Sequence, residues 1–292
     1  MLYRQNLFQG AVLIVASEFM FASMGAAVKA ASMTLPNEML VFMRNLVGLA
    51  ILLPLLLHGG LSGLATRVPH LHLLRSLAGV SAMYCFFYAL ANLPLADGML
   101  LKMTAPIFIP LVVWFWLREE LSPMALVAVP VGFIGVALVL RPEGGLTFVA
   151  LVGLAGGMLA AVAKTTVRRL TRTEPATRIV FYFAVLGVLV SAVPLSWAWR
   201  MPEGQEWGLL LFVGAAGTAG QFLLTRGYAA APAARVGPFT YFSVIFAALY
   251  GYLFWSEGLT LWFVSGALLI ALAGLLALRG RPKPAAVAQA AE

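Results

Sequence analysis

Hydrophobic runs of 18–23 residues recur along the whole chain, and each run ends at a charged residue, a proline or a short glycine-containing break. They fall near residues 8–30, 39–57, 73–92, 95–116, 123–140, 146–167, 177–199, 207–227, 233–254 and 260–278. A helix that crosses the hydrocarbon core of a bilayer needs about 20 apolar residues. The pattern therefore predicts an all-α membrane protein with ten transmembrane helices joined by short connections.

The composition supports this prediction. The chain has 292 residues, of which 62% are hydrophobic and 10% charged, whereas a soluble domain carries roughly 25% charged residues. A water-soluble fold and intrinsic disorder are excluded, and the lipid bilayer is the expected surrounding. The single cysteine, Cys85, can form no disulfide within the chain. The formal net charge of +8 does not predict nucleic-acid binding, because most cations lie between the apolar runs.

The distribution of lysine and arginine predicts the orientation of the chain. If both termini lie on one side, 14 of the 19 cations lie on that side and three lie on the other. Lys164, near the end of the sixth run, is counted on that side together with Arg168, Arg169, Arg172 and Arg178. Cytoplasmic loops carry the excess of basic residues, so the sequence predicts a multi-pass protein of the inner (cytoplasmic) membrane with both termini in the cytoplasm.

An internal repeat appears when the chain is compared with itself at an offset of 138 residues. Pro94 then falls on Pro232, and Glu119 falls on Glu257. Each half holds five apolar runs, and an odd number of spans makes the second half enter the membrane from the opposite side. The sequence therefore predicts two inverted five-helix repeats, residues 6–141 and 145–280, followed by a disordered cytoplasmic tail over 281–292.

Several short motifs resemble those of EamA-type carriers in the drug/metabolite transporter superfamily, over roughly residues 6–280. They are Phe42-Met43-Arg44-Asn45, Thr104-Ala105-Pro106-Ile107-Phe108, Glu119-Glu120-Leu121, Glu257-Gly258-Leu259, and Gly266 with Gly274. The resemblance implies a ten-helix bundle with a central cavity that works by alternating access and often exports amino acids or related metabolites. Val244 stands where the offset places the partner of Pro106, so the sequence does not predict the same kink in the second half.

Ionisable residues inside apolar runs are the first candidates for function, because each costs roughly 2.5–3.5 kcal/mol to insert. Glu18 lies in the middle of the first run. Its carboxylate either takes part in proton coupling or binds the amine of a substrate. The alternative is a structural ion pair with Lys102 or Arg44. Lys102 is a candidate for binding an anionic substrate or for proton coupling. The alternative is that it pairs with Asp97 or Glu18. For Arg44 an architectural role is favoured over substrate binding.

Polar side chains at helical spacing form two further candidate surfaces. Tyr84 and Tyr88 belong to a polar stripe in the third run, and Gln221 belongs to a comparable row in the eighth run. Tyr241 adds a third aromatic hydroxyl from the ninth run. We expect these stripes to line the cavity; the alternative is hydrogen bonding between packed helices.

The sequence predicts a secondary active transporter that exports a small zwitterionic or anionic metabolite, such as an amino acid, with or without proton coupling. The alternative within transport is exchange of a phosphorylated or nucleotide-linked solute. A membrane-embedded enzyme or a scaffold is a remote alternative, because no nucleophile–base pair is evident. No cofactor or metal site is predicted, and the sequence gives no prediction of oligomeric state.

Overall fold

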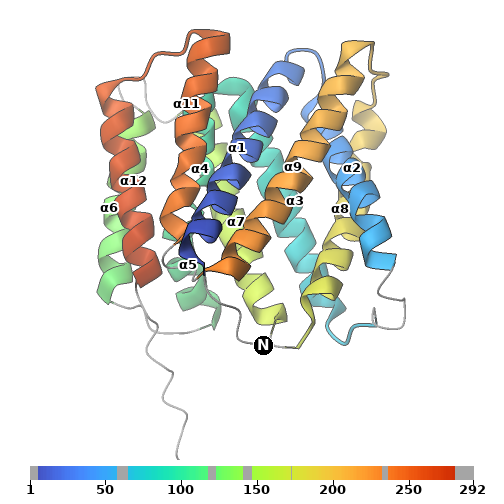
Figure 1. Ribbon diagram of the computed structural model, residues 1–292, viewed down its shortest axis with the longest axis horizontal. Helices are drawn as coiled ribbons and strands as arrows, with labels where there is room; N and C mark the ends of the chain where they lie inside the picture. Colours follow the sequence, from blue (N-terminus) through green and yellow to red (C-terminus); the bar gives the residue numbers. More distant parts are fainter. Residues whose placement is uncertain are drawn as a thin grey trace, which may run out of the picture.

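The computed structural model describes residues 6–57, 65–117, 123–140, 147–171, 173–231 and 236–279. All regular elements in these ranges are helices (Figure 1). The predicted tail 281–292 and the turn containing Glu119 lie outside the described residues. In chain order the elements are α1 Leu7–Ala31, α2 Asn37–Leu57, α3 Pro69–Asn92, α4 Leu95–Lys102, α5 Ala105–Val112, η2 Val113–Leu117, α6 Pro123–Leu140, α7 Phe148–Leu170, α8 Ala176–Ala198, α9 Gln205–Ala230, η4 Gly237–Tyr241, α11 Phe242–Trp255 and α12 Leu261–Arg279.

Seven helical segments of the described chain are long and apolar enough to cross a membrane, with α4, α5 and η2 counted together as Leu95–Trp116. Three shorter apolar segments, in α6, η4–α11 and α12, bring the number to the predicted ten. At 1.5 Å per residue, the 18 residues of α6 and the 19 of α12 reach about 27–28 Å, close to the ~30 Å of a hydrocarbon core. The chain is therefore a multi-pass membrane protein.

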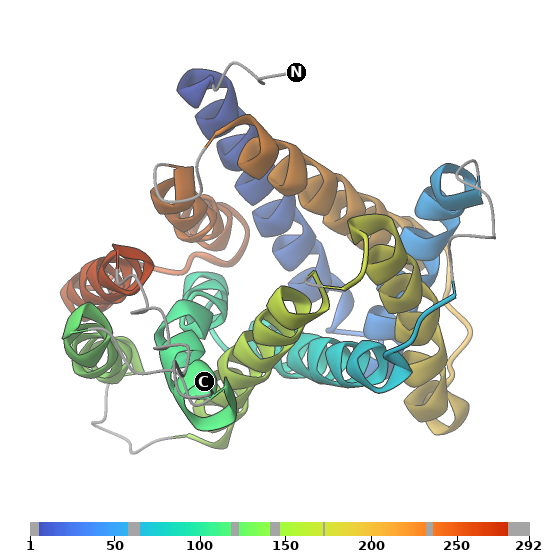
Figure 2. The ribbon, with the colours of Figure 1, turned by 90° about the horizontal axis from the view of Figure 1, so that it is seen from below.

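The helices pack in pairs that join the two halves of the chain. α1 packs against α9, α3 against α7, α2 against α8 and α6 against α12. α1 also contacts α11, and α7 contacts α4 and α5. Seen from below, the α1–α9 and α3–α7 pairs flank the centre of the bundle, while α6–α12 and α2–α8 lie at its two ends (Figure 2).

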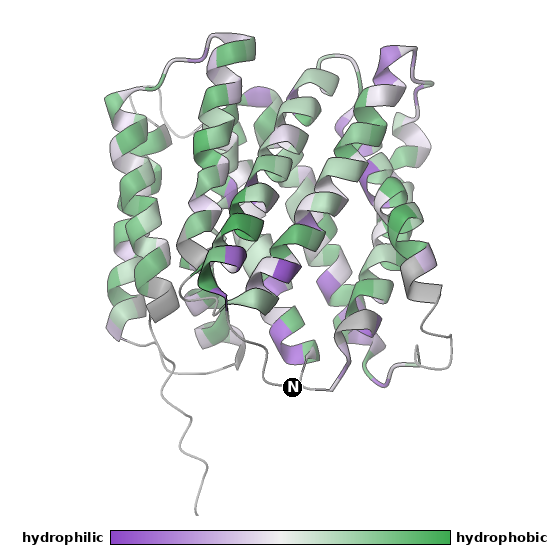
Figure 3. Ribbon diagram, in the orientation of Figure 1, coloured by the Kyte–Doolittle hydropathy of each residue, from purple (hydrophilic) through white to green (hydrophobic). Residues whose placement is uncertain are grey.

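Glycines allow the closest of these helix pairs to form. A Cβ atom built on Gly135 of α6 would lie 2.9 Å from the carbonyl oxygen of Gly266 in α12, so the two backbones are in direct contact. Large apolar side chains such as Phe115, Leu261 and Leu268 instead point outward. Apolar residues therefore cover the outer surfaces along the helices (Figure 3), as a lipid environment requires.

Both halves contain a broken helix beside the centre. The fourth span is interrupted at Met103–Thr104, between α4 and α5, just before Pro106. The corresponding segment of the second half begins as the 3-10 helix η4 and becomes the α-helix α11 between Tyr241 and Phe242. Offset by 138 residues, the two interruptions coincide. The second half therefore has a backbone irregularity here although it lacks the proline, because Gly237 and Pro238 start η4 instead.

Candidate functional site

A cavity of about 500 Å³ lies at the centre of the bundle. Its walls come from both halves of the chain, chiefly from α1, α3, α4, α5, α7, α9 and η4. Most of the lining side chains are apolar, including phenylalanines and methionines, and four are charged. The charged lining residues are Glu18, Arg44, Lys102 and Lys164. The size lies within the range of about 300–1,000 Å³ that small-molecule sites occupy.

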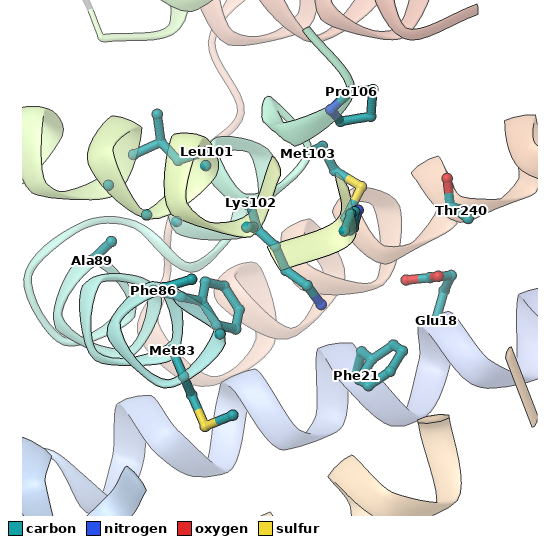
Figure 4. Close-up of a pocket in the computed structure, with 18 of the residues that line it drawn as sticks. Glu18, Phe21, Met83, Phe86, Ala89, Leu101, Lys102, Met103, Pro106 and Thr240 are labelled. Atoms are coloured by element: carbon teal, nitrogen blue, oxygen red, sulfur yellow. The ribbon is translucent and has the colours of Figure 1, made fainter. Parts of the chain in front are cut away.

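Glu18 lies halfway along α1, and its carboxylate points into the cavity toward Lys102 and Thr240 (Figure 4). The residue is 3% exposed. One carboxylate oxygen, Oε2, is buried without a hydrogen-bond partner among the described residues, while Lys102, Lys164 and the Ser243 hydroxyl are its electrostatic neighbours. A buried carboxylate with an unused oxygen can accept a proton or a ligand cation.

Lys102 reaches the cavity from the last turn of α4, immediately before the helix breaks. Its Nζ lies 4.3 Å from the ring centroid of Phe21 and 5.1 Å from that of Phe86, so two aromatic faces hold the ammonium group. Within the described chain, no carboxylate oxygen lies within 4.0 Å of this nitrogen. The predicted pairing with Asp97 or Glu18 is therefore not made as a direct ion pair.

Arg44 and Lys164 complete the charged lining. Arg44 of α2 donates a hydrogen bond to Oδ1 of the adjacent Asn45 at 3.2 Å, and the described residues give it no acidic partner within 4.0 Å. Lys164 lies in α7, six residues before Leu170 ends the helix. Its side chain remains solvent-accessible deep within the bundle because the cavity reaches it. In the sequence, Lys164 was grouped with the basic residues that set the orientation, and no pattern indicated that it lines the cavity.

The polar candidates divide into two groups. Gln221 and Tyr241 line the cavity, although the Tyr241 hydroxyl donates to the carbonyl oxygen of Ile270 at 3.1 Å. Tyr84 and Tyr88 do not line it: the Tyr84 hydroxyl donates to the Ser191 carbonyl at 3.4 Å, and the Tyr88 ring packs edge-on against a phenylalanine of α7. The face of α3 that meets the cavity is the apolar one, which includes Met83 and Phe86.

An ion pair joins the last turn of α1 to the α11–α12 connection. Lys29 Nζ lies 2.6 Å from Oε1 of Glu257 and also donates to the Leu93 carbonyl at 2.6 Å. The second oxygen of Glu257 accepts the backbone N–H of Leu95 at 2.7 Å. We call this set the Lys29–Glu257 latch. A second hollow of about 410 Å³, lined in part by Glu257 and Asp97, adjoins it.

A second acidic group fixes the connection between α7 and α8. Glu174 accepts a hydrogen bond from Thr66 at 2.7 Å and pairs with Arg178. Burial acts to raise the pKa of Glu174, but the hydrogen bonds from Thr66 and Arg178 outweigh it and hold the pKa below its usual value. This group lies outside the cavity lining and stabilises the structure near the end of the bundle opposite the latch.

Comparison with known proteins gives matches along the whole chain. The family model of the EamA-like transporter family matches twice, over residues 8–141 and 147–279. The pseudopaline exporter CntI of Pseudomonas aeruginosa is 34% identical over 268 residues, covering 90% of this chain and 94% of that one. A riboflavin transporter of Brucella anthropi is 27% identical, covering 84% and 89%.

A further relative and a solved structure also match most of the chain. An S-adenosylmethionine uptake transporter of Rickettsia felis is 27% identical, covering 74% of each chain. A solved crystal structure is similar in fold, with a TM-score of 0.63 at 19% identity, covering 92% of this chain and 96% of that one. The curated relatives are named as exporters or uptake transporters, which points to a transporter rather than an enzyme.

Proposed function

Because the chain belongs to the EamA-like transporter family, we propose that it is a secondary active transporter that exports a small zwitterionic or anionic metabolite across the cytoplasmic membrane. The observation that carries the proposal is the central cavity, in which a carboxylate and three cations face the same space without ion pairs within the described residues. Charges cost free energy in such a place unless a ligand or a partner compensates them.

We assign complementary roles to the charged groups. Lys102, held between two phenylalanine rings, binds a substrate carboxylate. Glu18 alternates between a proton and the substrate amine, because its unpartnered oxygen faces the cavity. Binding of one then displaces the other, which couples proton movement to transport. The export direction is supported by the exporter at 34% identity, while other relatives are named for uptake.

The proposed mechanism is alternating access by two inverted five-helix repeats. By order within each half, α1 corresponds to α7, α3 to α9, and α4 with α5 to α11. The α1–α9 contact then corresponds to the α7–α3 contact, and the α1–α11 contact corresponds to the contacts of α7 with α4 and α5. The structure contains all of these contacts. The α2–α8 and α6–α12 pairs each join two corresponding helices, so exchanging the halves leaves these pairs unchanged. The double match of the family model and the coincident helix breaks also support the repeat.

In this mechanism the Lys29–Glu257 latch closes the outer end of the path. This placement follows from the proposed cytoplasmic termini, since α1 runs from the terminal side toward Lys29. Met24, the last cavity residue of α1, precedes Lys29 by five residues, or about 7.5 Å along a helix. The latch therefore stands between the cavity and that end, and it must open for substrate to leave.

A ligand screen followed by transport tests the proposal. The purified protein is mixed with amino acids, dicarboxylates and phosphate esters, and the thermal unfolding midpoint is measured. A ligand at 100 times its Kd stabilises by about 2.7 kcal/mol. Ligands that stabilise the protein should leave loaded proteoliposomes faster when the protein is present.

The alternatives predict different results. A preference for phosphate esters would favour exchange of phosphorylated solutes, which the three cavity cations would also bind. Chemical turnover of a ligand in detergent, without two compartments, would favour an enzyme. Failure of every bound ligand to cross the proteoliposome membrane would contradict transport.

A further inference from the structure

The charges that face the main cavity do not balance. Arg44, Lys102 and Lys164 supply three positive charges, and Glu18 supplies one negative charge. The described part of the chain places no carboxylate within 4.0 Å of any of the three cations. A cation inside the bundle is stabilised by an anion that forms hydrogen bonds with it. The cavity therefore has more capacity for acidic groups than for basic ones.

The three cations reach the cavity from different helices. Arg44 extends from α2, Lys102 from α4 and Lys164 from α7, which are separate walls of the cavity. Lys102 is also fixed in place, since its ammonium contacts Phe21 and Phe86. A ligand with acidic groups at separated positions can contact all three cations at once, each from its own helix.

The size and the walls of the cavity constrain the rest of the ligand. One water molecule takes about 30 Å³ of liquid volume, so 500 Å³ corresponds to roughly 17 waters. A free amino acid with a single carboxylate fills only part of this space. The apolar wall, with Met83, Phe86, Leu101 and Met103 among its members, suits a carbon framework between the charged ends.

We propose that the cavity binds an amino polycarboxylate, a molecule of about 15–20 non-hydrogen atoms with one protonated nitrogen and two or three separated carboxylates. The nitrogen binds Glu18, and the carboxylates bind Lys102, Lys164 and Arg44. This inference rests on the proposed transport function and narrows the substrate class of the same site.

Matched dipeptides test the charge requirement directly. Binding to the full-length protein in detergent is measured by titration calorimetry with Glu-Glu, which has three carboxylates and one ammonium group. Gln-Gln has nearly the same size and shape but one carboxylate, and N-acetyl-Glu-Glu lacks the ammonium group. We expect Glu-Glu to bind at least about tenfold more tightly than either, because hydrogen bonds between opposite charges are about twice as strong as neutral ones.

Substitution of Lys164 tests the site itself. In Lys164→Gln, Glu-Glu should lose about tenfold in affinity while Gln-Gln changes by less than about twofold. The control is Arg226→Gln, which removes one positive charge from α9 outside the cavity lining, where Arg226 stacks on Phe222. The control variant should bind Glu-Glu as the wild type does.

The outcomes separate this inference from the function on which it rests. Equal affinity for Glu-Glu and Gln-Gln, no binding of Glu-Glu, or tighter binding of glucose 6-phosphate would overturn the polycarboxylate inference. Transport of a monocarboxylate amino acid would leave the proposed function standing in each of those cases. Only failure of transport in the proteoliposome assay contradicts the function.

Discussion

Glu257→Gln should open the end of the transport path that the latch closes. The substitution keeps an oxygen that can accept the Leu95 N–H, but it removes the charge that pairs with Lys29. The Lys29 and Glu257 side chains are 13% and 19% exposed, so solvent screens their attraction only in part. Glu257→Gln therefore weakens the attraction between residues 29 and 257 while largely keeping the geometry of their contact.

The size of the effect follows from these contacts. A hydrogen bond to a charged group contributes about 1.5–3 kcal/mol, and Lys29 retains its second acceptor, the Leu93 carbonyl. If the contact exists only in the closed state, its loss shifts the equilibrium toward the open state by about 10- to 150-fold, since 1.4 kcal/mol corresponds to tenfold.

Cysteine labelling measures this shift. Cys85 is replaced by alanine, and Met103, which lines the cavity, is replaced by cysteine. A membrane-impermeant maleimide added outside intact cells should label the Glu257→Gln protein 10- to 150-fold faster. The control is Glu206→Gln, which removes the charge of Glu206 that pairs with Arg200 of the α8–α9 connection, a pair that shares no residue with the latch. An unchanged labelling rate in Glu257→Gln, or an equal increase in the control, would refute the latch.

Three further predictions concern single side chains. Lys102→Met should weaken binding of acidic ligands by at least about tenfold yet raise the unfolding midpoint by about 2–4 °C, because it removes a half-buried cation that has no ion-pair partner among the described residues; a lower midpoint would contradict this. Gly135→Val should destabilise the protein by about 1–3 kcal/mol through contact with Gly266, measured by thermal unfolding, whereas Gly208→Ala, with no atom within 4 Å of the added Cβ, should not. The pKa of Glu174 is depressed in the folded protein, so the wild type should be more stable than Glu174→Gln above about pH 4.3, the usual Glu pKa. The difference in unfolding free energy between the two proteins should fade as the pH falls through the folded-state pKa. A difference that grows on acidification would contradict this prediction.

The sequence predicted the helices and the central ionisable residues for one physical reason. A bilayer requires long apolar segments, so ten of them could be counted, and a charge within such a segment is costly enough to indicate function. Glu18, Arg44 and Lys102 were found in this way, and the structure places all three around one cavity.

Lys164 and the tyrosines of α3 show where this reasoning stops. Lys164 lies near the end of the sixth run and close to Arg168 and Arg169, so it was grouped with the charges of the following loop. In the structure α7 continues six residues beyond Lys164 to Leu170, and the residue lines the cavity. Helical spacing shows that Tyr84 and Tyr88 share a face, but which face meets the cavity depends on packing against α7 and α8. A higher weight for lysines within two turns of a predicted helix end would have found Lys164.

The most direct test of the account is proton-coupled transport by the wild type and Glu18→Gln in proteoliposomes. The transported compound is the radiolabelled ligand selected by the thermal screen, and both efflux driven by a pH gradient and exchange without a gradient are measured. The account predicts that a pH gradient accelerates wild-type efflux and that Glu18→Gln loses this acceleration. A Glu18→Gln protein that transports at the wild-type rate with the wild-type response to pH would contradict it.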